Sequence, residues 1–168
     1  AGRIAGHLGL DNLIMYYDAN NIQLSTTVEE VDSEDVAAKY KAWGWHVIEI
    51  DGCCPEAIRK ALREAKATVG QPTLIIGKTI MGRGAVGPNG ENYENRVNTH
   101  GQPLSAAGAS IEATIKNLGG DPEAPFQIFP DVQELYAARL QELRELAKAR
   151  KQEEKTWREE NPDRASKR

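Results

Sequence analysis

Residues 13–24, Leu-Ile-Met-Tyr-Tyr-Asp-Ala-Asn-Asn-Ile-Gln-Leu, contain an apolar run that stops abruptly at a polar segment. The run over 13–17 is typical of a buried strand, and residues 18–21 end it. Ligands of open α/β sheets bind just beyond the carboxyl ends of the strands. There, the Asn20 side-chain oxygen and the Ile22 main-chain oxygen lie two positions apart on the same side of an extended chain, so they can converge on one hard cation. By itself, an Asn-Asn pair after a strand is more typical of a simple turn.

Two more apolar runs, over 45–50 and 73–79, are typical of strands, and a helical pattern precedes each of them. The β-α-β-α-β order with nearly continuous apolar strands predicts an α/β fold, a parallel sheet with helices on both faces. A short helix is also expected over 1–8. The two amphipathic helices are expected to begin at the N-cap Ser33, with the stripe Val36, Tyr40 and Trp43, and at Pro55, with the stripe Ile58, Leu62, Ala65 and Val69.

A long glycine-rich segment over 80–104 follows the third predicted strand, and irregular segments of that length are usually functional or disordered. The pattern then predicts a helix capped by Ser105, a proline-rich connector and a long C-terminal linker helix from about residue 131. We therefore expect an α/β domain over 1–120 and a connector with the linker helix over 121–168. The apolar stripe expected to bury one side of the linker helix is Val132, Leu135, Leu140, Leu143 and Leu146.

The composition excludes several classes of protein. With 168 residues, 40% apolar and 27% charged, the chain is typical of a soluble globular protein. It has no apolar run of the ~20 residues that a membrane span needs, and the net charge of −4 argues against general nucleic-acid affinity. Cys53 and Cys54 are adjacent and lack metal-site spacing, which argues against a disulfide framework or a zinc site. A reducing, cytoplasmic location is therefore expected. Because Ala1 already lies in a helical pattern, we expect the domain to be incomplete at its N-terminus and the chain to be a piece of a longer one.

Two further features follow the third predicted strand. Lys78-Thr79 leads into Gly82-Arg83-Gly84, and His100-Gly101 lies in the long glycine-rich segment. A cation site, a strand-end lysine and a loop histidine together suit a bound diphosphate, because Mg²⁺ takes few protein ligands plus phosphate oxygens and the lysine and histidine can bind the remaining ones. Each feature by itself also has an ordinary structural interpretation, as an exposed lysine or a flexible loop. His7 is expected to be a packing residue, and His46 is expected to face outward from its strand.

Four segments in this order resemble the transketolase family. They are Asp-Ala-Asn-Asn-Ile-Gln-Leu at 18–24, Tyr-Lys-Ala-Trp-Gly-Trp-His-Val at 40–47, Lys-Thr-Ile-Met-Gly-Arg-Gly at 78–84 and His-Gly-Gln-Pro-Leu at 100–104. The resemblance implies the thiamine-diphosphate-binding fold, with 1–120 as the diphosphate-binding domain. It also implies a homodimeric enzyme of the pentose phosphate pathway, with its active site at the subunit interface, that transfers a two-carbon ketol unit from a ketose phosphate to an aldose phosphate.

The resemblance also implies roles for individual residues. Asn20 and Ile22 would bind Mg²⁺ or Ca²⁺ through side-chain and main-chain oxygens, and Leu24 would pack near the thiazolium ring of thiamine diphosphate. Lys78 and His100 would contact the cofactor. His100 would also face the sugar phosphate as a catalytic residue, because a histidine can hydrogen-bond a developing alkoxide or move a proton near neutral pH.

The sequence departs from the family pattern in several places. The Gly-Asp-Gly motif that supplies another metal ligand is not found before Asn20, and the glutamate that activates the cofactor belongs to the family's next domain. The isolated chain is therefore expected to be inactive. Ser25-Thr26 replace Asp-Gly, and residues 97–99 lack a second histidine. Dihydroxyacetone synthase and deoxyxylulose-phosphate synthase are the alternative enzymes, although the segments over 40–47 and 100–104 argue against the second. A folded but inactive scaffold or dimerisation fragment is the other alternative.

Overall fold

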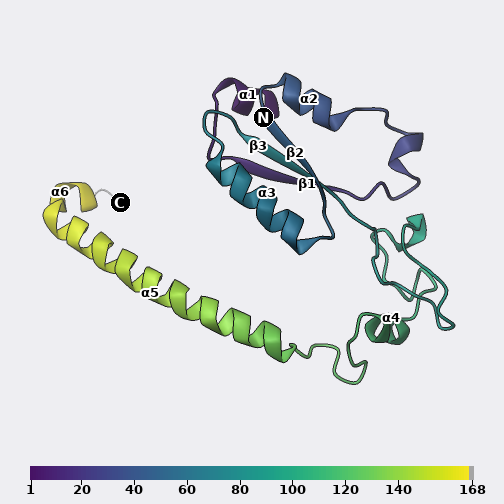
Figure 1. The fold of residues 1–168 in the computed structure, drawn as a ribbon. Helices are drawn as coiled ribbons and strands as arrows, with labels where there is room; N and C mark the ends of the chain where they lie inside the picture. Colours follow the sequence, from purple (N-terminus) through teal and green to yellow (C-terminus); the bar gives the residue numbers. More distant parts are fainter. Residues whose placement is uncertain (167–168) are drawn as a thin grey trace. The chain divides into compact units, whose positions relative to one another are not determined.

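The computed structural model describes residues 1–166 (Figure 1). These residues divide into two compact units, the first over Ala1–Glu123 and the second from Ala124 onward. The elements of the first unit are α1 (Gly2–His7), β1 (Ile14–Ala19), η1 (Val28–Glu30), α2 (Val36–Ala42), β2 (His46–Asp51), α3 (Pro55–Ala67), β3 (Thr73–Lys78), η2 (Val97–Thr99) and α4 (Ile111–Asn117). The second unit contains α5 (Pro130–Glu160) and α6 (Pro162–Ala165).

The three strands form one parallel sheet in the order β1-β3-β2. The central strand β3 is the most buried, because it pairs on both edges and is covered on both faces: Thr73 to Gly77 are all buried. The register pairs Ala19 of β1 and Asp51 of β2 with Lys78 of β3, so all three strands end at the same edge of the sheet. The predicted parallel α/β fold is confirmed.

One face of the sheet packs against α1 and α2. Leu74 and Ile76 of β3 form a core there with Ala5 and Trp45. The Trp45 indole N–H donates to the Gly2 carbonyl oxygen at 2.8 Å, which ties α1 to the turn before β2. A buried indole needs such a partner for its single donor. The hydrogen bond therefore orients the first helix against the sheet.

The other face packs against α3, with a helix stripe that differs from the predicted one. Ala61 and Ala65 are buried against Ile75 of β3, whereas Leu62 is 39% exposed. Val69 lies beyond the helix end and is 83% exposed, because Thr68 has an extended backbone that ends α3. The prediction for Leu62 and Val69 was wrong. Small side chains fill this face, which allows the helix backbone to approach the strands closely.

Two helix starts, those of α2 and α4, also differ from the predicted ones. Asp35, not Ser33, caps α2, because its Oδ1 accepts from the Ala38 N–H at 2.8 Å. Ser110, not Ser105, caps α4, because its Oγ accepts from the Ala113 N–H at 3.1 Å. Ser105 lies in a turn, and Ser33 lies in an irregular segment before the observed cap. A side chain of the right chemistry caps a helix only where the backbone leaves the extended conformation.

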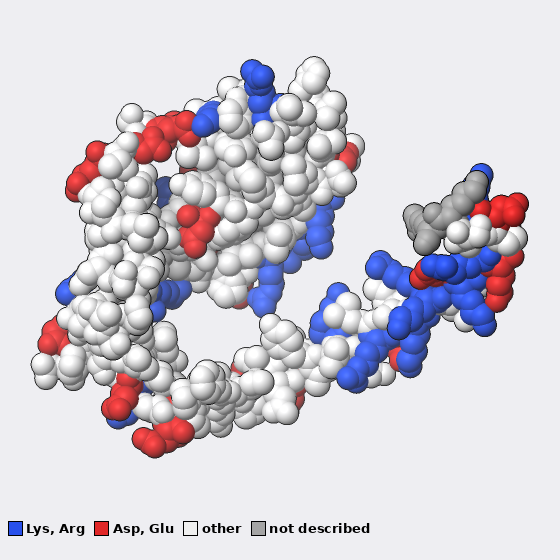
Figure 2. All heavy atoms as spheres, turned by 180° about the vertical axis from the view of Figure 1, so that it is seen from behind, with Lys and Arg blue, Asp and Glu red and all other residues white. Residues whose placement is uncertain are grey.

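The long helix α5 is confirmed, but the predicted burial of its apolar stripe was wrong. Within the described part of its unit no α5 side chain is buried, and Leu135 and Leu140 are 64% and 47% exposed. Its surface carries both basic and acidic side chains, and the basic ones predominate on the face that Figure 2 shows. Ion pairs such as Lys148–Glu145 at 2.8 Å lie three or four residues apart. None of the helices formed by residues 1–166 has the length and apolar content to cross a membrane.

We predict that Gly6→Ala destabilises the first unit. An added Cβ at Gly6 would lie 1.8 Å from the carbonyl oxygen of Trp43, so α1 would have to move off the turn before β2. Overpacking of this kind costs about 1–3 kcal/mol of unfolding free energy. That loss would be seen even though alanine is the better helix former. Denaturant unfolding of the variant measures the loss.

Gly2→Ala is the matched control in the same helix. Its Cβ would meet only side-chain ring atoms, of Trp43 at 3.0 Å and of Tyr40 at 3.5 Å, and a side chain can give way where a backbone cannot. Gly2→Ala should therefore change the unfolding free energy much less than Gly6→Ala. Equal effects of the two substitutions would contradict the packing of α1 described above.

Candidate functional site

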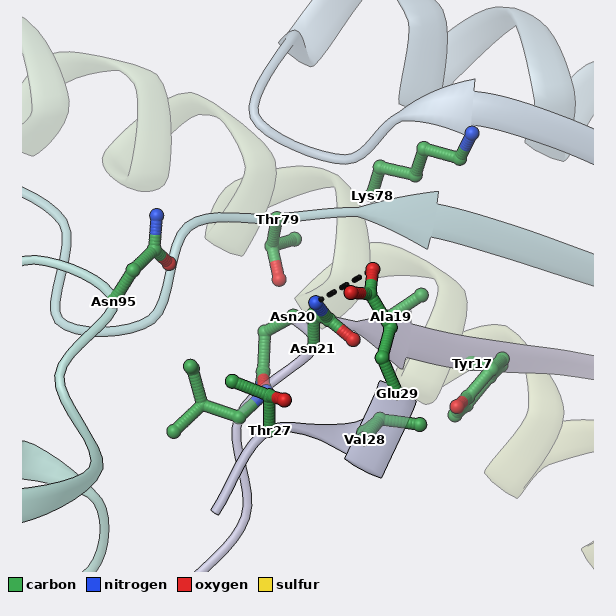
Figure 3. Close-up of a pocket in the computed structure, with 11 residues that line it drawn as sticks. Tyr17, Ala19, Asn20, Asn21, Thr27, Val28, Glu29, Lys78, Thr79 and Asn95 are labelled. Carbon is green, nitrogen blue, oxygen red and sulfur yellow. Dashed lines mark hydrogen bonds between the residues drawn. The ribbon is translucent and has the colours of Figure 1, made fainter. Parts of the chain in front are cut away.

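A cavity of about 580 Å³ opens at the edge where the strands end (Figure 3). This is where ligands of open α/β sheets bind. Its wall combines the segment after β1, the first turn of η1, the end of β3 and one residue of the long loop. The lining residues are Tyr17, Ala19, Asn20, Asn21, Ile22, Thr27, Val28, Glu29, Lys78, Thr79 and Asn95.

The segment Asn20–Asn21–Ile22 is a tight turn in which, among residues 1–166, the Asn21 carbonyl oxygen is hydrogen-bonded and the Ile22 carbonyl oxygen is not. The Ile22 N–H donates to Oδ1 of Asn20 at 3.0 Å, and Asn21 has a left-handed backbone with φ of 63°. Ile22 is 8% exposed and forms an antiparallel bridge with Thr27. Among residues 1–166, no donor is hydrogen-bonded to the Ile22 carbonyl oxygen. This oxygen and the second lone pair of Asn20 Oδ1 are therefore available to a ligand.

Lys78 borders the cavity, but its side chain lies away from the asparagines. Figure 3 shows its ammonium group pointing away from Asn20. The exposed lysine also lines a second hollow of about 290 Å³ beside Asp51. Thr79, the next residue, donates its hydroxyl to Oδ1 of Asp18, which joins the ends of β3 and β1. The stem of Lys78 is exposed, so its side chain can change rotamer without disturbing the packing of the sheet.

Tyr16 lies near the same end of the sheet as the cavity, on the face of the sheet opposite to that of Tyr17. An added Cβ at Gly77 would lie 1.8 Å from the Tyr16 hydroxyl, so glycine makes room for the ring near the C-terminal end of β3. Burial raises the pKa of the Tyr16 phenol above its ordinary value, and the negative charge of Asp18 raises it further. The phenol is therefore a neutral hydrogen-bonding group at physiological pH. Nothing in its sequence position indicated this contact.

His100 follows η2 in the long loop and does not line the cavity of Asn20. Its Nδ1 is buried, and no residue among 1–166 hydrogen-bonds it. Leaving a polar atom in that state costs about 1–3 kcal/mol, so a buried orphan nitrogen is a sign of a missing ligand. The Thr73 hydroxyl is also unpartnered, but it lies at the far end of β3 from the cavity.

Leu24 is brought to the His100 loop by the fold. It is 73% exposed, and an added Cβ on Gly101 would lie 3.4 Å from Leu24 Cδ2. The five predicted site residues therefore form two groups within the first unit. Asn20, Ile22 and Lys78 line the cavity, whereas Leu24 lies beside the loop that carries His100.

Polar side chains hold the long loop in shape, and sequence reasoning missed them. Oδ1 of Asn95 accepts from the Met81 N–H at 3.1 Å, and the Asn95 N–H donates to the Met81 carbonyl oxygen at 2.9 Å. Oε1 of Glu94 accepts from the Gly84 N–H at 2.7 Å. Asn95 also lines the cavity and, like Asn21, has a positive φ. An asparagine between charged residues in a loop has no distinguishing sequence signal, so only the contact with Met81 reveals it.

The donor set of the cavity suits a hard cation shared with an anionic ligand. Amide and carbonyl oxygens are ligands that Mg²⁺ and Ca²⁺ accept, with phosphate oxygens and water completing the shell. Within residues 1–166, no cluster of three or more histidine, cysteine, aspartate or glutamate side chains could hold a metal ion. The amide oxygen of Asn20 and the carbonyl oxygen of Ile22 could therefore supply two ligands to such a cation.

Comparisons with known proteins all point to one family. The family model described as transketolase, thiamine diphosphate binding domain, matches residues 1–168. A transketolase 2 of Xanthobacter flavus is 42% identical over 137 residues, which are 81% of this chain and 19% of the relative. A dihydroxyacetone synthase of Pichia angusta is 38% identical over 135 residues, 79% of this chain and 18% of the relative. This chain thus spans about a fifth of the length of these relatives.

Solved structures agree. A transketolase of Campylobacter jejuni is 33% identical, with a TM-score of 0.73 over 87% of this chain and 22% of the other. A transketolase of Pichia stipitis, solved in complex with sedoheptulose 7-phosphate, is 29% identical, with a TM-score of 0.82 over 98% of this chain and 24% of the other. The likeness extends over the α/β unit and the helix that follows it.

Proposed function

Since this chain belongs to the transketolase family and matches its thiamine diphosphate binding domain, we propose that the protein transfers a two-carbon ketol unit from a ketose phosphate to an aldose phosphate. The observation that carries the proposal is the turn Asn20–Ile22, with its unpartnered carbonyl oxygen, at the ligand-binding edge of the sheet. Thiamine diphosphate, when bound, supplies the chemistry that breaks and forms the carbon–carbon bond. The protein's part is to hold the cofactor and orient the sugar.

The cavity residues would bind the charged end of the cofactor. Oδ1 of Asn20 and the main-chain oxygen of Ile22 would hold Mg²⁺ or Ca²⁺, which the diphosphate oxygens would share. The Lys78 ammonium group would neutralise part of the diphosphate charge. Rigid anchoring of the diphosphate matters because a small displacement of the reacting atoms costs a large part of the rate.

His100 and Leu24 would act at the reactive end of the cofactor. The unpartnered Nδ1 of His100 supports a role as hydrogen-bond partner of the cofactor and of the sugar hydroxyl groups. From there the imidazole can hold or move a proton at a substrate oxygen. Leu24, next to Gly101, would pack against the apolar ring of the cofactor.

The proposed setting is a cytoplasmic homodimer of the pentose phosphate pathway, with the active site at the subunit interface. Its substrates would be sugar phosphates. Solved relatives from Pichia stipitis are described as complexes with sedoheptulose 7-phosphate and fructose 6-phosphate, which supports this substrate class.

Ketol transfer by the full-length protein tests the proposal. With xylulose 5-phosphate as donor and ribose 5-phosphate as acceptor, we expect product formation that requires both thiamine diphosphate and Mg²⁺ or Ca²⁺. The control omits the cofactor and adds a metal chelator. A protein that binds neither thiamine diphosphate nor a divalent cation would contradict the proposal.

Dihydroxyacetone synthase is the second candidate, because a relative of that name is 38% identical to this chain. By carbon count, addition of a two-carbon ketol unit to formaldehyde gives dihydroxyacetone. The same assay with formaldehyde in place of the aldose phosphate therefore separates the two functions. We expect a kcat/KM for the aldose phosphate well above that for formaldehyde, and the reverse ratio would favour the second candidate.

A further inference from the structure

We propose that Glu29 is a positioning residue for the cation site, acting through the side chain of Asn21. The proposal rests on the proposed function, because it concerns the two residues, Asn20 and Ile22, that would hold the cation. Glu29 is not one of the residues that the sequence motifs single out. The fold brings its carboxylate into the wall of the cavity (Figure 3).

The backbone of Asn21 is the strained point of the turn. Its φ of 63° lies in the left-handed region, which is unfavourable for an ordinary L-residue. Asparagine tolerates this conformation better than most residues. Asn21 lies between the two proposed ligands, so a change of its backbone angles would redirect the main-chain oxygen of Ile22 relative to the side chain of Asn20.

Glu29 holds the side chain of that strained residue. Nδ2 of Asn21 donates to Oε1 of Glu29 at 3.3 Å, across eight positions of the sequence. The backbone prepares this contact, because the Val28 N–H donates to the Asn21 carbonyl oxygen at 3.0 Å. The bridge between Ile22 and Thr27 closes the same loop. Main-chain bonds thus bring η1 next to the turn, where the exposed Glu29 carboxylate accepts a hydrogen bond from the Asn21 side chain.

The neighbouring Glu30 provides a natural comparison. It has the same charge and lies on the same 3-10 helix, but its carboxylate accepts from the Thr26 hydroxyl and does not contact Asn21. Any general effect of negative charge near the cavity should therefore be shared by Glu29 and Glu30. An effect through the turn should belong to Glu29.

The test measures the dissociation constant for Mg²⁺ by titration calorimetry, with the full-length protein saturated with thiamine diphosphate. Glu29→Ala should weaken Mg²⁺ binding about three- to tenfold, the range that corresponds to one hydrogen bond. Glu29→Gln keeps an acceptor oxygen and should stay within about twofold of the wild type. Glu30→Ala should leave the constant unchanged, and the melting temperature of each ligand-free variant should stay close to that of the wild type.

Rescue by glycine separates positioning from a direct effect. Glycine adopts the left-handed conformation without a side-chain restraint. In an Asn21→Gly background, Glu29→Ala should therefore produce no further loss of Mg²⁺ affinity. A further loss equal to that in the wild-type background would overturn the proposal and assign Glu29 a direct electrostatic role. Wild-type affinity in Glu29→Ala itself would also overturn it, whereas failure of the wild type to bind Mg²⁺ would instead overturn the proposed function.

Discussion

Replacing His100 with alanine should lower the turnover of ketol transfer by about 10²- to 10⁴-fold, the range that a positioned acid–base group contributes. The physical reason is the buried Nδ1, which has no hydrogen-bond partner among residues 1–166 and which, under the proposed function, would bind the cofactor or the sugar. The kcat of the full-length protein with saturating donor and acceptor measures the effect. His100→Gln keeps hydrogen-bonding atoms but cannot carry the proton, so it should recover substrate affinity more than kcat.

His46→Ala is the matched control for this substitution. His46 lies at the start of β2, where its Nε2 is 3.0 Å from Oε1 of Glu64 and far from the strand ends. Its removal should leave kcat unchanged, because an exposed pair of this kind contributes little even to stability. Full turnover in His100→Ala would show that the histidine has no part in the reaction.

The second large effect is expected at Asn20. Asn20→Ala should weaken binding of thiamine diphosphate with Mg²⁺ about a hundredfold or more, because even residues that only orient metal ligands cost 10- to 100-fold. The alanine would remove both the proposed ligand oxygen and the acceptor for the Ile22 N–H. Calorimetric titration of the full-length protein with the cofactor, with and without Mg²⁺, measures the loss.

Two control variants separate these roles. Asn20→Asp keeps an oxygen for both the cation and the Ile22 N–H, so it should retain most of the Mg²⁺-dependent affinity. Asn12→Ala changes an exposed asparagine at the opposite end of β1 and should have no effect. If Asn20→Ala bound the cofactor with the same dependence on Mg²⁺ as the wild type, Asn20 would not be a ligand of the cation.

The local sequence pattern was sufficient to predict the larger part of the fold. The apolar runs that became β1, β2 and β3 are nearly continuous, and the central strand β3, which is buried on both faces, needs such a run whatever its neighbours are. The helix start at Pro55 was also predicted correctly, since proline favours the first helical position through its own ring. Errors occurred where two choices were locally equivalent. Ser33 and Asp35 can both cap a helix, and the turn of the chain around residue 34 decides between them.

Burial was harder to predict than secondary structure. Leu62 and Ala61 both continue the helical pattern of α3, yet the alanine faces the sheet. Hydrophobicity alone would favour burial of the leucine. The face of α3 that packs on Ile75 instead carries small side chains, which let the helix backbone approach the strand. The apolar stripe of α5 shows the same limit, because a stripe indicates a face that can be buried and does not supply the surface that buries it.

For the candidate site, the sequence by itself determined the edge of the sheet and the residues Asn20, Ile22 and Lys78, because a polar stop after a buried strand is a local signal. The tertiary structure decided which distant groups join them. Glu29 reaches Asn21 through the closed loop, Asn95 lines the cavity from the long loop, and Leu24 lies beside Gly101. These contacts join residues from eight to more than seventy positions apart, and no periodicity or spacing encodes them. They exist because the backbone hydrogen bonds of the folded chain bring the segments together.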